Sequence, residues 1–352
     1  MEKELENLTA DPAENNGNMP EGRFIVFDLE WNQSADGKNG AVPGLPFEII
    51  EIGAVKLDRN RRVLDTFSRI VRPSVYPRLH YKVLEITHFG MDELRKRGEP
   101  FSKVIRDFLD WSFEPGTRPV FCTYGSMDLM ELQRNIAYFG VEDPFPYPFL
   151  YYDVQKLFSL LYEENRKDRP PLEKAAEHFG IPMDRPFHRA LDDAVYTAKV
   201  LEALDFDRAA AYLSLDYYRL PKTREEEIYL VFPDYSKYVS RLFPSRDDAL
   251  RDRTVMDMVC YRCNRMLRKK IRWFSPNSHQ FLCLACCPEH GFVKGKLRLK
   301  RAENGKVFAV KTIKLISEEG AAAIEKKREE TAAHHAVRNR KRHMKEKNRR
   351  KE

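Results

Sequence analysis

Two carboxylates stand one residue apart at the end of an apolar run near the start of the chain. The run FIVFDLEWNQ covers residues 24–33, and its acids are Asp28 and Glu30. Successive side chains of a strand alternate between its two faces, so both acids are expected on the same face. Two anions held this close raise each other's pKa unless a cation lies between them. A strand end with two solvated acids is the alternative for this motif alone.

Three further residues with catalytic chemistry follow along the chain. Asp128 lies in TYGSMDLMEL at the start of an expected helix, and His188 and Asp193 lie five residues apart in HRALDDA. Taken singly, an acid in the first turn of a helix can simply interact with the helix dipole, and His188 can be an ordinary loop residue. Asp192 is a competing acid, but the five-residue step from His188 favours Asp193.

The elements expected around these residues indicate an α/β domain. Apolar runs predict strands over residues 23–29, 49–57, 63–71 and 119–124, and helical periodicity predicts helices over 101–113, 127–140, 153–165, 171–179 and 189–204. Strands that are followed by alternating strands and helices predict a mixed sheet flanked by helices over residues 23–205.

The ordered set of D-x-E at a strand end, an acid at a strand-to-helix turn and H-x-A-x-x-D on a late helix resembles a known family. It is similar to the DEDDh 3′–5′ exonucleases of the RNase H-like (DnaQ-like) fold, over about residues 23–205. The stretch EIIEIGAVKLD at residues 48–58, together with TYGSMDLMEL and HRALDDA, looks most like the Eri-type RNA exonucleases and their KapD-like bacterial relatives.

This resemblance implies a catalytic site with two Mg²⁺ or Mn²⁺ ions. Asp28 would bridge both ions, Glu30 and Asp193 would complete the nucleophile-side site, Asp128 would help hold the second ion, and His188 would be the general base. Such ions stabilise charge on the attacking and leaving oxygens of a phosphodiester, and they prefer carboxylate ligands. Trp31 follows Glu30 where many relatives carry a small residue, so it either stacks on the terminal base or packs in the wall.

The cysteines of the C-terminal part indicate a metal site. Five of the six lie within 28 positions, spaced as C-x2-C, 19 residues and C-x2-C, which matches a zinc ribbon. The simplest set of ligands for one structural Zn²⁺ is Cys260, Cys263, Cys283 and Cys286. Cys287 and His290 lie near enough to substitute, and an iron–sulfur centre uses the same type of ligand.

Charge is segregated along the chain. Residues 1–250 carry a net charge of −10 and residues 251–316 a net charge of +12. A basic half joined to an acidic half that holds cations indicates a polyanionic partner. In KGKLRLKR the basic residues alternate with apolar ones, which predicts either a nucleic-acid platform or a solvated strand face. The candidate contacts here are Arg268, Lys269, Lys270, Arg272, Trp273, Lys294, Lys296, Arg298 and Lys300.

The remaining segments complete the expected organisation. We expect a disordered leader over residues 1–22, a helical or irregular connector over 206–250, a zinc-ribbon-like basic β domain over 251–318, and a basic helical or disordered tail over 319–352. No apolar run is long enough for a membrane span, and the acidic N-terminus does not read as a secretory signal. A cytoplasmic protein without membrane contact is therefore expected.

These features predict a metal-dependent 3′–5′ exonuclease that trims single-stranded or 3′-overhanging RNA. The basic tail would add contacts to nucleic acid, structured RNA or a ribosome. Three alternatives remain open at this point: a single-stranded DNA exonuclease, a noncatalytic nucleic-acid-binding protein, and a regulator that acts mainly through the cysteine module.

Overall fold

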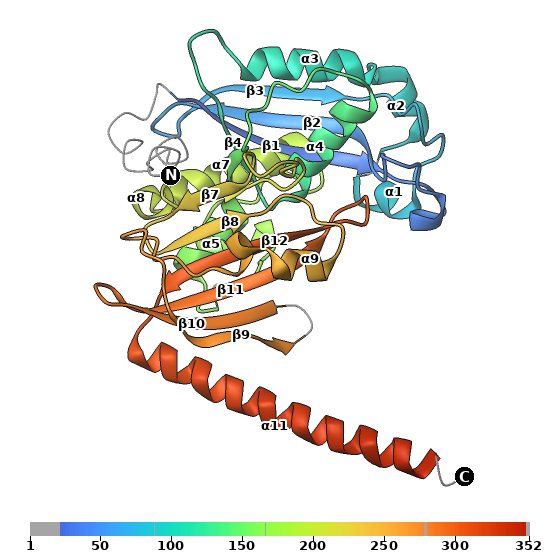
Figure 1. The fold of residues 1–352 in the computed structure, drawn as a ribbon. Helices are drawn as coiled ribbons and strands as arrows, with labels where there is room; N and C mark the ends of the chain where they lie inside the picture. The colour runs from blue at the N-terminus through green and yellow to red at the C-terminus, as the bar shows by residue number, and fades with distance from the viewer. Residues whose placement is uncertain (1–21, 88, 166, 278–279, 350–352) are drawn as a thin grey trace. The chain divides into compact units, whose positions relative to one another are not determined.

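The chain folds into two compact units, each with its own sheet (Figure 1). The structure is a computed structural model that describes residues 22–87, 89–165, 167–277 and 280–349. The boundary lies between Arg219 and Leu220, which differs from the expected connector over residues 206–250. Residues 1–21 of the expected leader lie outside the described range.

The first unit contains the expected mixed sheet, which has six strands. Its strand order is β3-β2-β1-β4-β5-β6, in which β1, β2 and β3 pair antiparallel, β1, β4 and β5 pair parallel, and β6 is antiparallel to β5. The strands are β1 (Phe24–Asn32), β2 (Glu48–Leu57), β3 (Val63–Ile70), β4 (Val120–Thr123), β5 (Leu150–Asp153) and β6 (Ser214–Leu215). The sequence predicted the first four strands but not the short β5 and β6.

Helices cover both faces of this sheet. They are α1 (Tyr81–Thr87), α2 (Met91–Arg97), α3 (Phe101–Ser112), α4 (Met127–Tyr138), α5 (Val154–Tyr162), α6 (Leu172–His178), α7 (Ala190–Ala203) and α8 (Phe206–Ala209), with the short 3-10 helix η2 (Gly37–Gly40) after β1. The core against α3 and α4 includes Ile25 and Phe27 of β1. The core against α5 and α7 includes Phe24 and Val26. This alternation along β1 is the period of two that the sequence predicted.

The second unit is built on an antiparallel sheet of order β7-β8-β12-β11-β10-β9. Its strands are β7 (Ile228–Val231), β8 (Tyr235–Val239), β9 (Lys269–Asn277), β10 (Gln280–Cys287), β11 (Gly291–Arg301) and β12 (Val307–Leu315). The turn between β11 and β12 contains Gly305, whose φ is positive at 79°. Strands β7 and β8 lie within the segment that the sequence described as a connector.

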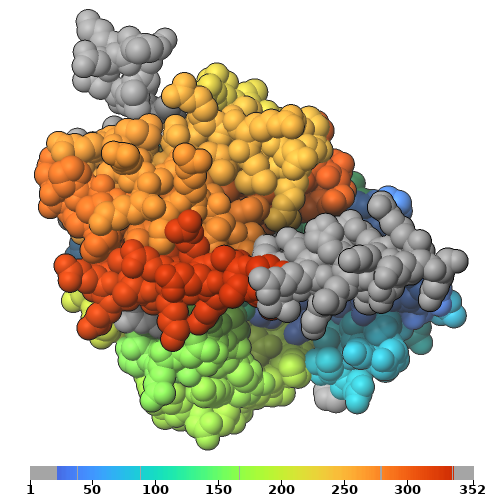
Figure 2. All heavy atoms as spheres, turned by 60° about the horizontal axis from the view of Figure 1, so that its bottom comes forward, coloured from blue at the N-terminus to red at the C-terminus, as the bar shows by residue number. Residues whose placement is uncertain are grey.

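Helices of the second unit pack against the two faces of its sheet. The short helices α9 (Arg246–Arg251) and α10 (Arg253–Met256) contribute Ala249 and Val255 to one hydrophobic cluster. The long helix α11 (Glu318–Arg349) buries Ala321 and Ile324 near its start against Ile271 and Leu284. Figure 2 shows this red start of the helix lying along the orange strands. Among the described residues, no helix is long and apolar enough to cross a membrane.

Candidate active site

Strand β1 places two acids on the face of the first sheet that α5 and α7 cover. Phe24 and Val26 face this core, and Asp28 and Glu30 continue the same alternation toward the end of the strand. Burial, with the nearby carboxylates of Asp193 and Glu51, raises the pKa of Glu30 to about 8. Burial and then the charge of Asp128 raise the pKa of Asp28 well above its ordinary value.

The first turn of α4 brings the third acid to the same place. Strand β4 pairs with β1 only over residues 24–26, so the backbone N–H of Leu29 is available to another acceptor. It donates to Oδ1 of Asp128 over 3.3 Å, which fixes that carboxylate beside β1. Burial raises the pKa of Asp128 to about 7. Because Asp128 is buried and bonded to β1, an interaction with the helix dipole alone does not explain its position.

The start of α7 supplies the last two predicted residues. The backbone N–H of His188 donates to Oδ2 of Asp193 over 2.9 Å, and His188 itself is exposed with a positive φ of 67°. Ligand atoms of Glu30, His188 and Asp193 all lie within 4.8 Å of one another. Asp192 instead pairs with Arg185 over 2.9 Å, so the choice of Asp193 as the residue facing the acids agrees with the structure.

A residue that the sequence reasoning missed holds α7 in position. Both carboxylate oxygens of Glu51 on β2 accept from the guanidinium of Arg189, at 2.8 and 3.2 Å, and the backbone N–H of Ala190 donates to Oε2 over 3.1 Å. Arg189 and Ala190 lie between His188 and Asp193 along the chain. The only signal for Glu51 in the sequence is an acid inside the apolar run EIIEIGAV.

Gly53 permits the close approach of α7 to the acids. It pairs in register with Asp28, and a Cβ at this position would lie 2.0 Å from the backbone nitrogen of Leu191. Backbone atoms cannot move away as the end of a flexible side chain can. The helix that carries Asp193 therefore reaches Asp28 because β2 has no side chain at this point.

The acids are arranged as a site for cations. Oδ1 of Asp193 is buried and has no hydrogen-bond partner in the described residues, and the pKa of Asp193 is raised to about 7 by burial. A buried carboxylate oxygen without a partner is costly unless it is protonated or binds a metal ion. The donor set of carboxylates and one imidazole fits divalent ions such as Mg²⁺ or Mn²⁺.

A hollow of about 180 Å³ opens beside Glu30. Trp31 and Gln33 line it from the end of β1, and Lys82 and Ile86 line it from α1. Trp31 also packs against Phe47, with ring centroids 5.7 Å apart. Its indole therefore packs against the core and also lines the hollow, as in the interpretation of Trp31 as part of the wall. Stacking on a terminal base stays a prediction.

The second predicted cysteine pair does not join the first. Donor atoms of Cys260 and Cys263 gather with those of Cys287 and His290 instead. Strand β10 runs through Cys287, so Cys283 and Cys286 point to opposite faces and cannot approach one ion together. Cys283 is fully buried, and its thiol lies 3.1 Å from the carbonyl of Ile271. The alternative ligands that the sequence left open are the ones that the structure assembles.

The basic residues that the sequence predicted to contact nucleic acid differ in their position and exposure. Lys294, Lys296, Arg298 and Lys300 alternate with buried residues along β11, as expected for one strand face. On and before β9, Arg268, Lys270 and Arg272 are exposed and Lys269 is half-buried. Trp273 is a correction, because its indole N–H donates to the carbonyl of Met256 over 2.7 Å and its ring packs in the core of the second unit. This tryptophan is not a free stacking platform.

A family profile and a known protein both match this chain, and both are described as exonucleases. The profile of the family described as "RNase_T: Exonuclease" matches residues 25–201, just over half of the chain. The Bacillus subtilis (strain 168) protein named "Probable 3'-5' exonuclease KapD" is 32% identical over 194 residues, which cover 54% of this chain and 88% of that protein.

Solved structures of nucleases align with the chain at lower similarity. The nuclease domain of 3'hExo, described as a DEDDh family member bound to rAMP, gives a TM-score of 0.48 and 23% identity, over 57% of this chain and 99% of that chain. Cell-death related nuclease 4 (CRN-4) gives 0.45 and 19%, over 56% and 67%. From the match of the family profile and the identity to the Bacillus protein, this chain belongs to the exonuclease family.

Proposed function

We propose that the protein is a metal-dependent exoribonuclease that removes nucleotides from the 3′ end of RNA. The observation that carries this proposal is the convergence of Asp28, Glu30, Asp128 and Asp193 on one buried place beside the exposed His188. A noncatalytic binding protein has no use for four clustered acids whose burial raises the pKa of each. The name of the Bacillus relative, a 3'-5' exonuclease, supports the polarity.

Each residue has a role in the hydrolysis. Two divalent ions held by the four acids would neutralise charge on the attacking and leaving oxygens. His188 takes a proton from a water molecule, and the water oxygen attacks the terminal phosphorus. The bond from that phosphorus to the 3′ oxygen of the preceding nucleotide breaks, and this oxygen takes a proton from solvent. The products are a nucleoside 5′-monophosphate and a chain shorter by one nucleotide.

The hollow beside Glu30 suits the terminal nucleotide. Trp31 and Ile86 offer apolar surface to a base, and Ile86 is 40% exposed. Gln33 and Lys82 offer hydrogen-bond donors for a ribose hydroxyl or a phosphate. A site with donors at this position favours RNA, because the 2′-hydroxyl is the group that distinguishes RNA from DNA.

The second unit would add affinity for the substrate backbone. Exposed cations before and on β9, together with the basic face of β11, provide the positive charge that phosphates attract. The basic helix α11 extends this charge, and we propose that it contacts structured RNA or a ribosome. These contacts would recruit RNA without reading its sequence.

The test is a time course with matched 5′-labelled RNA and DNA oligonucleotides in Mg²⁺ or Mn²⁺. We expect an RNA ladder that shortens one nucleotide at a time, releases nucleoside 5′-monophosphates and disappears in Asp28→Ala. A faster ladder on DNA would overturn the RNA assignment and leave the exonuclease intact. Binding without shortening, or equal cleavage by Asp28→Ala, would overturn the catalytic proposal.

A further inference from the structure

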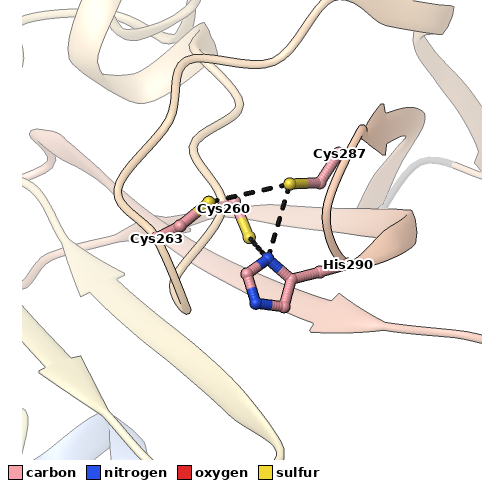
Figure 3. Close-up of side chains that lie close together, drawn as sticks. All are labelled: Cys260, Cys263, Cys287 and His290. Carbon is pink, nitrogen blue, oxygen red and sulfur yellow. Dashed lines mark hydrogen bonds between the residues drawn. The ribbon is translucent and has the colours of Figure 1, made fainter.

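Four side chains of ligand type meet in the second unit, away from the acids of β1. Cys260 and Cys263 come from the segment before β9, Cys287 is the last residue of β10, and His290 lies in the connection from β10 to β11 (Figure 3). Cys263 Sγ lies 3.6 Å from Cys287 Sγ. Nδ1 of His290 lies 3.5 Å from Cys287 Sγ and 3.7 Å from Cys260 Sγ.

These separations match the edges of a tetrahedron around a metal ion. Zn–S bonds of about 2.3 Å and Zn–N bonds of about 2.1 Å place sulfurs about 3.8 Å apart, and sulfur and nitrogen about 3.6 Å apart, around a tetrahedral Zn²⁺. The observed separations fall within about 0.2 Å of these values. A disulfide would bring two sulfurs to about 2.05 Å, and all the cysteines described are free.

The two segments that supply the donors are built alike. Each carries its two ligands with two residues between them, as Cys260-x2-Cys263 and Cys287-x2-His290. Each then turns through a residue with positive φ, which is 53° at Asn264 and 78° at Gly291. This repeat is the geometry of two knuckles that face one ion. The pair Cys283 and Cys286 has the same spacing, but it lies within strand β10 and not before a turn.

Backbone amides support the sulfurs. The N–H groups of Glu289 and His290 are directed at the sulfur of Cys287, and the N–H of Arg265 is directed at that of Cys263. Hydrogen bonds of this kind orient metal ligands and stabilise their thiolate form. A pair of cysteines that only packed in a core would not collect them.

We propose that Cys260, Cys263, Cys287 and His290 form a closed tetrahedral Zn²⁺ site. Four protein ligands leave no open position, so the ion is structural. It ties the segment before β9 to the β10–β11 connection, where Cys260 and Cys287 already pack with Met258. Because β11 begins at Gly291, directly after the last ligand, the site also fixes the start of the strand that carries Lys294–Lys300.

The first test measures metal per chain by mass spectrometry. The full chain is purified without added zinc in a Glu30→Gln and Asp193→Asn background, which removes both carboxylates of the Glu30–His188–Asp193 group and so keeps zinc from collecting there. We expect one zinc per chain in this parent and in Cys286→Ser, and loss of zinc in Cys287→Ser and His290→Ala. Cys286→Ser is the matched control, since it removes the neighbouring thiol that the sequence alone had favoured.

Three results would overturn the proposal. They are no zinc in the parent, iron with inorganic sulfide in its place, or loss of zinc in Cys286→Ser with retention in Cys287→Ser. Loss of zinc in all the variants would also overturn the ligand assignment, because it would reduce these residues to a general role in folding.

A second test remains decisive even if the variants that lose a ligand fail to fold. His290→Cys keeps four donors, so it is expected to fold and to bind Co²⁺ after exchange. The sulfur-to-cobalt absorption should rise by about one third, the ratio of four thiolates to three in tetrahedral coordination. An unchanged spectrum in His290→Cys would show that residue 290 does not bind the ion.

Discussion

The acids of the first unit and the thiols of the second unit are both clusters of ligand atoms. They differ in how much of an ion's coordination shell the chain itself supplies. The thiol cluster has four donors within 4.8 Å of one another, three of whose separations match the edges of a tetrahedron, and amides directed at its sulfurs. The acid cluster has a buried oxygen of Asp193 without a partner and lies beside an open hollow. The first arrangement supplies all four ligands of one ion from its own residues, while the ions of the second would need substrate and water to complete their shells. This difference separates a scaffold site from a reactive one.

Holding the acids of the first unit close together has an energetic cost. Raising the pKa of Glu30 from 4.5 to about 8 corresponds to a few kcal/mol against its charged form, at roughly 1.4 kcal/mol per unit. Besides burial, Asp128 and Glu51 contribute to this cost, because their charges raise the pKa of Glu30. Both are held in place by hydrogen bonds, Asp128 from the backbone of Leu29 and Glu51 from the start of α7. Divalent ions would reverse the cost, because they favour the charged carboxylates.

The largest expected effect comes from removing one residue from each cluster. Asp28→Ala should lower kcat/KM by about 10³-fold or more, since several kcal/mol of charge stabilisation depend on this site, and should leave the melting temperature equal or higher. Cys287→Ser should instead lower the melting temperature of the second unit. Activity assays and calorimetry on both variants measure this, and a collapse of stability in Asp28→Ala would erase the distinction.

His188, the proposed general base, is the next most sensitive point. His188→Gln should lower kcat by about 10²–10⁴-fold, because it removes the group that accepts the proton of water. The exposed imidazole contributes little to packing, so the melting temperature should not change. His334→Gln, which changes an exposed histidine of α11, serves as the control for the rate measurement. Equal rates for the two variants would remove His188 from the chemistry.

Glu51 tests whether the acid cluster depends on a residue that touches no substrate. Glu51→Gln weakens the paired bonds to Arg189 and leaves that charge without its partner, so we expect kcat to fall by about 10-fold and the Mn²⁺ concentration for half-maximal rate to rise. Asp192→Asn is the matched control, because its partner Arg185 is exposed. A fall in rate without any change in Mn²⁺ dependence would contradict a positioning role.

The smallest effect concerns stability and pH. Acids whose pKa is raised on folding bind more protons in the folded state, so the metal-free protein should lose stability as pH rises from about 5 to 8. Glu30→Gln should flatten this decline, and saturating Mn²⁺ should remove it. Melting temperatures measured at intervals of pH test this, and a wild-type curve that rises over the range would contradict the raised pKa values.

Five candidate residues could be picked out because their types and order resemble those of an exonuclease family, and the structure gathers them at one place. Their catalytic roles are part of the proposed function. Period-two alternation placed Asp28 and Glu30 on one face, and the step from His188 separated Asp193 from Asp192. Glu51 could not be identified from the sequence, because a single acid in an apolar strand does not indicate its partner Arg189, which lies 138 residues away.

The proposed zinc ligands show where spacing stops being sufficient. Cys283 and Cys286 repeat the C-x2-C pattern, but only the extent of β10 reveals that their side chains point apart. Strands β7 and β8 were not predicted for a related reason. A short strand is recognised by the strands with which it pairs, and the sequence alone does not give this pairing. Strand β8 pairs with β12, which is more than 60 residues further along the chain.

The central claim is that the acids of β1, α4 and α7 form one site for divalent cations and a nucleotide. Anomalous diffraction from crystals grown with Mn²⁺ and adenosine 5′-monophosphate tests it most directly. We predict two Mn²⁺ ions between the phosphate and the carboxylates, with Asp28 bound to both and the base in the hollow beside Trp31. Anomalous density that is absent from these carboxylates, while the nucleotide binds elsewhere, would contradict the account.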